Sequence, residues 1–319
     1  MNSVIIDGMS FAMPLFIIAI GGIYSERSGI TNLALEGLQG FGAFIGALFV
    51  TLTAGSFASG SMVPFYLALV FAACGGAVYA MLHALLCIKF KADQVISGVV
   101  VNILAMALTG FLTPQINSML TGVFSDKFQL GVSARWTVDA LRNIPVLGGF
   151  FTNVYPFEVV ILIVAAFAWY VMYRSRFGMR LRACGDNPHA VDAAGIDVAK
   201  VRFRAVVISG ALAGIGGISF AYSISASFSS AIYMGYGYLS IAALIFGNWR
   251  IMPTFGACLL FGFARSAGYK IVQMLGLPST YSDLIMTLPY VLTLLLLVFF
   301  SGSNRAPRAL GEIYDKGKR

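Results

Sequence analysis

The chain alternates between long apolar runs and short polar breaks. An α-helix rises about 1.5 Å per residue, so a run of roughly 20 apolar residues crosses the ~30 Å hydrocarbon core of a bilayer. Counted in this way, the pattern predicts about nine membrane spans, within a range of eight to ten, at residues 4–24, 32–52, 63–88, 94–112, 156–173, 203–222, 236–246, 252–275 and 284–300.

Composition supports the same fold class. Hydrophobic residues make up 59% of the chain and charged residues 11%, with a mean hydropathy of +0.85. A soluble domain averages about 25% charged residues. We therefore expect an all-α, polytopic membrane helix bundle that forms one domain over residues 1–302, followed by a basic tail at 303–319.

Basic residues are distributed unequally between alternate loops. Sixteen of the 21 Lys and Arg residues fall in the breaks that would share one side of the membrane with the tail, and four fall on the other side. Because Lys and Arg concentrate in cytosolic loops, this predicts a cytosolic C-terminus and an external N-terminus in the plasma membrane. The same rule explains the net charge of +8 without nucleic-acid binding.

The segment 174–204 between the fifth and sixth spans holds seven of these basic residues. At its centre, Asn187 and Pro188 are typical of a helix start, with Asn as the N-cap and Pro at the first helical position. Gly195 is typical of a helix end. The segment therefore predicts a short capped helix in a structured cytosolic loop, which we expect to dock onto another protein.

Polar side chains within the predicted spans are few. Asn32, Glu36 and Gln39 follow an i, i+4, i+7 spacing that places them on one helical face, and Asn102 lies inside the fourth span. Polar groups at membrane depth are costly, which makes them candidates for a translocation path. They could equally cross-link helices through hydrogen bonds.

Motifs of enzyme chemistry are absent from the sequence. It contains no GxxxxGK[ST] phosphate loop, its two His residues have no metal-site spacing, and its four Cys residues show no paired spacing. We expect no catalytic residues, no metal site and no cofactor bound by this chain. His83 is interpreted as a packed, hydrogen-bonded side chain. Transport is the leading class of function.

Three blocks of the sequence, which together cover most of the chain, resemble one protein family. They are SERSGITNLALEGLQGFGAF from residue 25, FGMRLRACGDNPHAVDAAGI from residue 177, and GYLSIAALIFGNWRIMPTFGACLLFG from residue 237. These blocks are similar to signatures of the permease subunits of ABC importers in the branched-chain amino acid, ribose and nucleoside group, and most similar to the nucleoside branch.

The resemblance implies a partner for the central loop, a cytosolic ATP-binding-cassette ATPase that would bind ATP and Mg²⁺ itself. It further implies a second, homologous permease subunit, an external substrate-binding lipoprotein, a nucleoside substrate and contact with membrane lipid. The docked element would comprise residues on the family pattern and their neighbours: Arg180, Arg182, Asp186, Asn187, Pro188, Ala190, Ala193, Ala194 and Gly195.

Two other functions remain open at this stage. One is the same kind of importer carrying a sugar or a branched-chain amino acid, and the other is a secondary transporter or channel that works without an ATPase. If the chain is the permease of a nucleoside importer, as the resemblance implies, solute moves by alternating access, driven by the partner ATPase.

Overall fold

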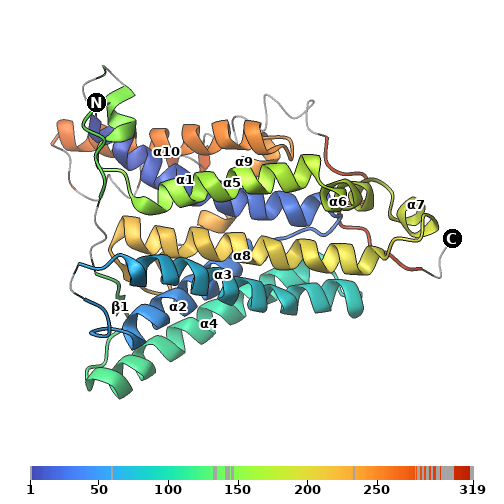
Figure 1. The fold of residues 1–319 in the computed structure, drawn as a ribbon, viewed down its shortest axis with the longest axis horizontal. Helices are drawn as coiled ribbons and strands as arrows, with labels where there is room; N and C mark the ends of the chain where they lie inside the picture. The colour runs from blue at the N-terminus through green and yellow to red at the C-terminus, as the bar shows by residue number, and fades with distance from the viewer. Residues whose placement is uncertain are drawn as a thin grey trace.

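The structure is a computed structural model that describes residues 2–58, 60–131, 135–140, 144, 147–232, 234–276 and 305–316, with isolated positions between 277 and 304. Within these ranges the chain is a bundle of helices (Figure 1). The α-helices are α1 (Asn2–Arg27), α2 (Leu35–Leu52), α3 (Val63–Ala84), α4 (Gln94–Thr121), α5 (Pro156–Arg174), α6 (Arg176–Asp186), α7 (Pro188–Ala193), α8 (Val198–Ile224), α9 (Tyr236–Phe246) and α10 (Ile251–Met274).

Shorter elements connect these helices. A π-helical turn, η1 (Leu85–Lys89), extends α3, and a 3₁₀ turn, η2 (Leu147–Phe151), precedes α5. The strands β1 (Phe128–Gln129) and β2 (Ser227–Phe228) pair antiparallel.

The helices agree with most of the predicted spans. In the described part of the chain, α1, α2, α3 with η1, α4, α5 and α8 are long and apolar enough to cross a membrane. Helix α9 has the predicted bounds but only 11 residues, and the 24-residue α10 carries Arg265 and Lys270. The ninth predicted span, 284–300, lies largely outside the described residues, so the total of nine spans stays a prediction.

Among the described helices, two predicted boundaries were wrong by five residues or more. Helix α4 continues to Thr121 instead of ending at 112, and Pro114 lies within it. Helix α8 begins at Val198, five residues before the predicted start, because the Asp197 side chain accepts a hydrogen bond from the Lys200 amide at 3.0 Å and caps it. The charged residues of the first turn had masked this start.

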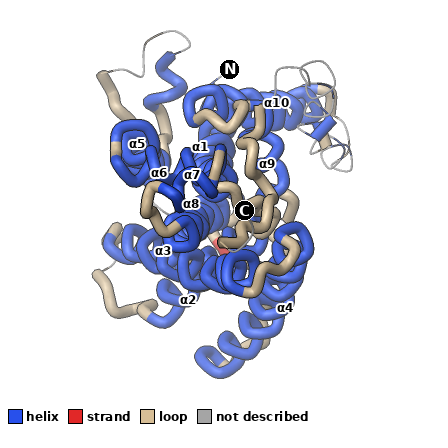
Figure 2. The backbone as a smooth tube through the Cα atoms, turned by 90° about the vertical axis from the view of Figure 1, so that its right-hand side faces the viewer, coloured by secondary structure: helices blue, strands red, loops and turns tan. Residues whose placement is uncertain are grey.

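Helices α1 and α8 form the centre of the bundle. Between residues 11 and 24 almost every side chain of α1 is buried, on all sides of the helix, which is the pattern of a helix surrounded by others. Figure 2 views the bundle from the end at which α6 and α7 lie, with α3 and α5 on one flank and α9, α10 and α4 on the other.

Small residues allow α2, α3 and α8 to pack closely. Gly42 of α2 and Ala72 of α3 both lie directly against Gly214 of α8, so a side chain at Gly214 would overlap the Ala72 carbonyl. Close approach at small residues is the usual way in which helices associate inside a membrane. The glycines of α2 and α8 therefore serve close helix packing.

The basic loops gather at one end of the molecule, which we call the basic end. It carries α6, α7 and the C-terminus, and the N-terminus lies at the opposite end (Figure 1). Arg27 Nε donates to the Trp249 carbonyl at 3.0 Å, and Lys91 pairs with Asp315 at 3.0 Å. The basic loops that were predicted to share one side of the membrane with the tail thus lie at one end of the structure. The side of the membrane that this end faces stays a prediction.

The glycine contact predicts a stability difference between two Gly-to-Ala variants. Gly214→Ala should destabilise the bundle by about 1–3 kcal/mol, because the methyl group overpacks a tight contact, and should lower the thermal unfolding midpoint of the detergent-solubilised protein. The control is Gly256→Ala on α10, where no atom lies within 4 Å of the new methyl group. Equal midpoints for the two variants would contradict the packing role.

Candidate functional site

Residues 28–34, between α1 and α2, pass through the bundle as non-helical backbone, and side chains of other helices complete its hydrogen bonds. Gln94 Oε1 accepts from the Thr31 amide at 2.7 Å, and Asn102 Nδ2 donates to the Leu33 carbonyl at 2.8 Å. His83 lies 3.3 Å from the Thr31 carbonyl through Nε2. Irregular backbone inside a membrane needs such partners, and the interpretation of His83 as a hydrogen-bonded packing residue is confirmed.

Asn32 belongs to this break and not to a helical face. Helix α2 begins at Leu35, so the predicted i, i+4, i+7 face is wrong for Asn32. Its side chain is fully buried, accepts from the Ala34 amide at 3.2 Å and donates to Ser209 Oγ of α8 at 2.8 Å. Asn32 therefore fixes the turn before α2 and links it to α8.

Glu36 binds the start of α9. Its Oε1 accepts from the Gly235 amide at 2.5 Å and its Oε2 from the Gly237 amide at 2.6 Å. Gln39 Nε2 adds a hydrogen bond to Oε2 at 3.2 Å. The first amides of a helix have no partner within the helix and carry the positive end of its dipole. The Glu36 carboxylate thus satisfies amides at the start of a helix that begins inside the bundle.

The close approach at Glu36 depends on glycine. Gly235 has φ +91°, and a Cβ atom on Gly237 would lie 2.5 Å from the Glu36 amide nitrogen and 2.6 Å from its carboxylate. A larger residue at Gly237 would separate α9 from α2, and one at Gly235 would be strained by the positive φ. Gly237, the first residue of the third sequence block, therefore serves this contact.

Asn102 lies beside Glu36 and shares a cavity with it. Its Oδ1 accepts from the Gly37 amide at 2.7 Å, and its Nδ2 donates to the Tyr238 hydroxyl at 3.0 Å as well as to Leu33. Glu36, Asn102 and Tyr238 line a cavity of about 240 Å³ together with small and apolar residues of α2, α4 and the segment before α9. Asn32 and Gln39 do not line it.

The cavity lies at membrane depth and near one face of the bundle. Asn102 is eight residues beyond Gln94, roughly 12 Å along α4. The lining residues Ile103, Met106, Met234 and Tyr238 are between 44% and 59% exposed. The cavity therefore adjoins an apolar face of α4 and α9.

Sequence reasoning missed Glu26 and Tyr238. Glu26 is buried and its Oε2 accepts from Trp249 Nε1 at 2.5 Å. Glu26 lies in SERSG of the first sequence block and Trp249 lies in GNWR of the third. A contact between these two blocks could therefore have been predicted from the sequence. Tyr238 also lay in the third block but carried no pattern of its own.

The loop between α5 and α8 contains two helices where one was predicted. The predicted limits of α7 are confirmed, because Asn187 Oδ1 accepts from the Ala190 amide at 3.0 Å and Gly195 has φ +77°. The missed helix is α6, which buries Gly178, Leu181 and Cys184 along one face. Arg176 and Arg180 lie on its exposed side.

The predicted docking residues are mostly accessible. Pro188 is buried and holds α7 to the loop, and the exposed members are Asp186, Asn187, Ala190, Ala193, Ala194 and Gly195. Arg180 is exposed, whereas Arg182 donates to the Gly178 carbonyl at 3.3 Å and lies over the Tyr173 ring at 5.5 Å. The apex of the loop is therefore a patch of small side chains.

Arg202 is a buried anchor of the basic end, with 2% of its surface exposed. Its Nε donates to the Ser28 carbonyl at 3.0 Å, its Nη1 to the Glu312 carbonyl at 3.1 Å and its Nη2 to the Cys184 carbonyl at 3.5 Å. In the sequence, Arg202 was counted only as one of the seven basic residues of the segment 174–204, which indicate topology. That interpretation does not account for a guanidinium that joins three separate segments.

One of those segments is the C-terminal tail, which we call the strap over its described residues 305–316. The Ala309 amide donates to the Gly185 carbonyl at 2.8 Å and the Gly311 amide to the Gly29 carbonyl at 3.1 Å. In Figure 2 the C-terminus lies over the middle of the basic end. The predicted basic tail is therefore a packed part of the bundle over these residues.

The end of the strap also contacts α7. Lys316 pairs with Asp192 at 3.4 Å, and the rings of Tyr314 and His189 lie 5.3 Å apart. The exposed ion pair contributes little stability by itself. It nevertheless brings the strap beside the predicted docking helix.

The arrangement of a bundle with a discontinuous helix at an internal cavity fits transport. Residues 4–298 match the family model of the branched-chain amino acid transport system permease component. The chain belongs to this permease family. No solved structure matches it.

Curated relatives of this permease extend over its whole length. It is 39% identical to the nucleoside ABC transporter permease protein NupC of Lactococcus lactis, over 99% of this chain and 97% of the relative. It is 37% identical to the guanosine ABC transporter permease protein NupQ of Bacillus subtilis, over 97% and 95%. A putative glucose ABC transporter permease protein, TsgC13 of Haloferax volcanii, is 31% identical over 79% and 72%.

Bacillus subtilis also has a second relative of this permease. Its guanosine ABC transporter permease protein NupP is 25% identical over 95% of this chain and 82% of the relative. This permease is therefore more similar in sequence to NupQ than to NupP, which are two guanosine permeases of the same bacterium.

The contacts of Arg202 predict how the strap is held. Arg202→Gln should loosen it, because the shorter side chain loses the donors to Ser28 and Glu312, and trypsin should cleave within 305–316 several times faster. Burial raises the pKa of the Cys184 thiol to about 11, so its alkylation near neutral pH should be slow in the wild type. In the variant the loosened strap should expose the thiol and speed its alkylation, which outweighs the smaller effect of losing the Arg202 charge that lowers this pKa. Peptide mass spectrometry measures both rates.

The matched control for this experiment is Arg204→Gln, which removes the same charge from an exposed position two residues away. It should leave both rates at wild-type values. Equal cleavage and alkylation in the two variants would contradict the anchoring role of Arg202.

Proposed function

We propose that this permease is the transmembrane subunit of an ATP-binding-cassette importer of nucleosides. The observation that carries the proposal is full-length similarity of 37–39% to permeases named for nucleosides and guanosine. The similarity to a putative glucose permease is weaker and covers less of the chain, and it makes a sugar the second candidate substrate.

The cavity at Glu36 and Asn102 supports a role in translocation. It presents a carboxylate, an amide and the Tyr238 hydroxyl beside apolar side chains, which is the composition of small-molecule sites. Because Asn32 and Gln39 lie outside it, we assign them to holding α2 in place. Glu36 and Asn102 remain our candidates for the solute path.

The exposed side of this cavity suggests a second subunit. Ile103, Met106 and Met234 are large apolar side chains at its rim, and a homologous permease packed against α4 and α9 would complete the wall. The two guanosine permeases of Bacillus subtilis suggest that the partner is a related but different chain. Solute would then cross between the two permeases.

The basic end would face the cytosol under the positive-inside rule. The exposed alanines of α7 would seat in a groove of a cytosolic ATPase, with Arg180 on the approach. That subunit would bind ATP and Mg²⁺, since this chain contains no phosphate loop. Its closure would switch the permease pair between outward and inward openings, and an external lipoprotein would deliver the nucleoside.

Uptake by intact cells tests the substrate. Deletion of the gene should abolish uptake of radiolabelled guanosine or uridine and leave uptake of ribose, glucose and leucine unchanged. Complementation with the wild-type gene serves as the control. Loss of glucose uptake with normal nucleoside uptake would favour the second candidate and overturn the first.

A bulky charge on α7 should uncouple the transporter. Ala194 is exposed at the helix end, so Ala194→Glu would disturb ATPase docking without disturbing the fold. We expect uptake to fall at least tenfold while the amount of protein in the membrane stays at the wild-type level, as measured by transport and immunoblotting.

The matched control adds the same charge at the opposite end of the bundle, as Ala58→Glu in the exposed loop after α2. Uptake in this variant should stay close to the wild-type value. Full uptake by Ala194→Glu would refute the docking role of α7.

A further inference from the structure

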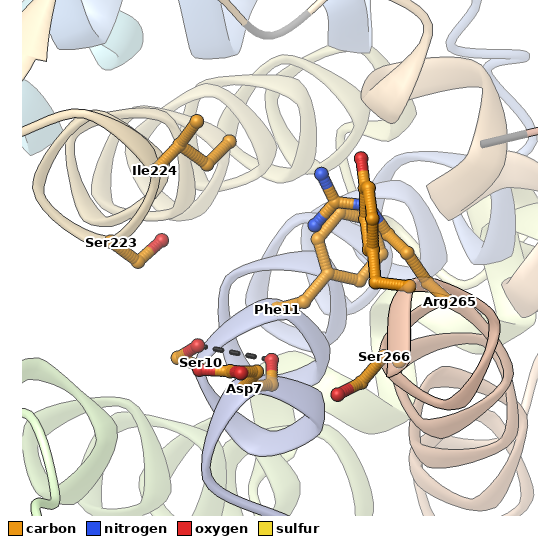
Figure 3. Close-up of a pocket in the computed structure, with 9 residues that line it drawn as sticks. Asp7, Ser10, Phe11, Ser223, Ile224, Arg265 and Ser266 are labelled. Carbon is orange, nitrogen blue, oxygen red and sulfur yellow. Dashed lines mark hydrogen bonds between the residues drawn. The ribbon is translucent and has the colours of Figure 1, made fainter. Parts of the chain in front are cut away.

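A second and larger cavity lies between α1, α8 and α10, toward the end of the bundle that carries the N-terminus. Its volume is about 370 Å³, within the range of small-molecule sites. One wall carries Arg265, Phe11 and Tyr269, and the other carries the oxygen-bearing side chains of Asp7 and of serines on all three helices. Figure 3 shows the Arg265 guanidinium beside the Phe11 ring, with Ser10, Asp7 and Ser266 across the cavity.

Arg265 has aromatic neighbours where an ion pair would be expected. Its guanidinium lies 4.3 Å from the Phe11 ring centre and 5.3 Å from that of Tyr269, and its Nη2 donates to the Tyr236 hydroxyl at 3.3 Å. Among the described residues no carboxylate lies within ion-pair distance of it. A charged side chain inside the bundle of a membrane protein is a candidate for a functional site. Among the described residues, the one hydrogen bond of Arg265 leaves most of its five N–H donors for a ligand.

The cavity adjoins the Glu36 site through the start of α9. Tyr236, which binds Arg265, stands between Gly235 and Gly237, whose amides bind Glu36. Arg265 is 14 residues beyond Ile251, roughly 21 Å along α10 from the basic end, and Asn102 is roughly 12 Å along α4 from the same end. The two cavities therefore follow one another along the direction of transport.

The chemistry of the two walls matches the two parts of a nucleoside. The half-buried Tyr269 ring can stack on a base, whereas the Phe11 ring is buried under the Arg265 guanidinium. Arginine donates two parallel hydrogen bonds to the O6 and N7 atoms of guanine. A carboxylate is a common partner of ribose hydroxyls. We propose that this cavity is a nucleoside-binding subsite that selects 6-oxopurines through Arg265 and holds the ribose through Asp7.

This inference rests on the proposed nucleoside import, and competition experiments in cells separate the two. In cells complemented with the wild type, unlabelled guanosine and inosine should inhibit radiolabelled guanosine uptake more strongly than adenosine or uridine. Arg265→Gln should lower guanosine uptake at least tenfold and raise the adenosine-to-guanosine uptake ratio, because a glutamine amide pairs with N6 and N7 of adenine.

The matched control is Lys270→Gln. Lys270 lies on the same helix and donates to Gln273 at 3.0 Å without lining the cavity. The Lys270→Gln variant should retain the wild-type rate of guanosine uptake and the wild-type adenosine-to-guanosine uptake ratio. If Arg265→Gln lowers the uptake of all nucleosides equally, or leaves the adenosine-to-guanosine uptake ratio unchanged, the assignment of Arg265 is overturned. If the wild type imports no nucleoside, the proposed function itself is overturned.

A second variant tests the ribose wall without disturbing the core. Asp7 is exposed near the start of α1, so Asp7→Asn should fold normally. The wild type should prefer guanosine over 2′,3′-dideoxyguanosine as a competitor, and Asp7→Asn should lose most of that preference. Retained discrimination in this variant would overturn the role of Asp7.

Discussion

Backbone amides and carbonyls inside a membrane have no water to bind, and this constraint governs the centre of the permease. In the described part of the chain, non-helical backbone enters the bundle in residues 28–34 and before the start of α9. Side chains complete the hydrogen bonds at both places. Asn102 serves both, through Leu33 and Gly37 on one side and Tyr238 on the other. The polar residues that suggested a solute path are therefore also the supports of the broken helices.

Helix α9 connects the features that transport requires. Its first turn holds Glu36 through backbone amides and Arg265 through the Tyr236 hydroxyl. Its far end leads into Trp249, whose indole binds Glu26 and whose carbonyl accepts from Arg27. With 11 residues, or roughly 16 Å, the helix is short enough to move as one rigid piece. A shift of the basic end would thus reach both cavities directly.

Local signals in the sequence predicted much of this fold. Apolar runs gave the long helices, and the Asn187, Pro188 and Gly195 signals gave the limits of α7, because capping depends on neighbouring residues only. Arg202 was misinterpreted because its partner Glu312 lies 110 residues away. For Asn32 the alternative of a cross-link between helices is confirmed, but its partner Ser209 lies 177 residues away and could not be named from the sequence. The Arg265 cavity was missed for the same reason. Its walls come from three helices, and none of them carries a recognisable motif alone.

The strap has a consequence for how the protein is made. Chains are synthesised from the N-terminus, so residues 305–316 leave the ribosome after every helix described here. Until then the Arg202 guanidinium lacks its Glu312 partner, and the carbonyls of Gly29 and Gly185 lack the amides of Gly311 and Ala309. The basic end closes only after residues 309–312 have been synthesised. A chain truncated before residue 305 would keep its helices but leave the Arg202 guanidinium and the Gly29 and Gly185 carbonyls without their strap partners.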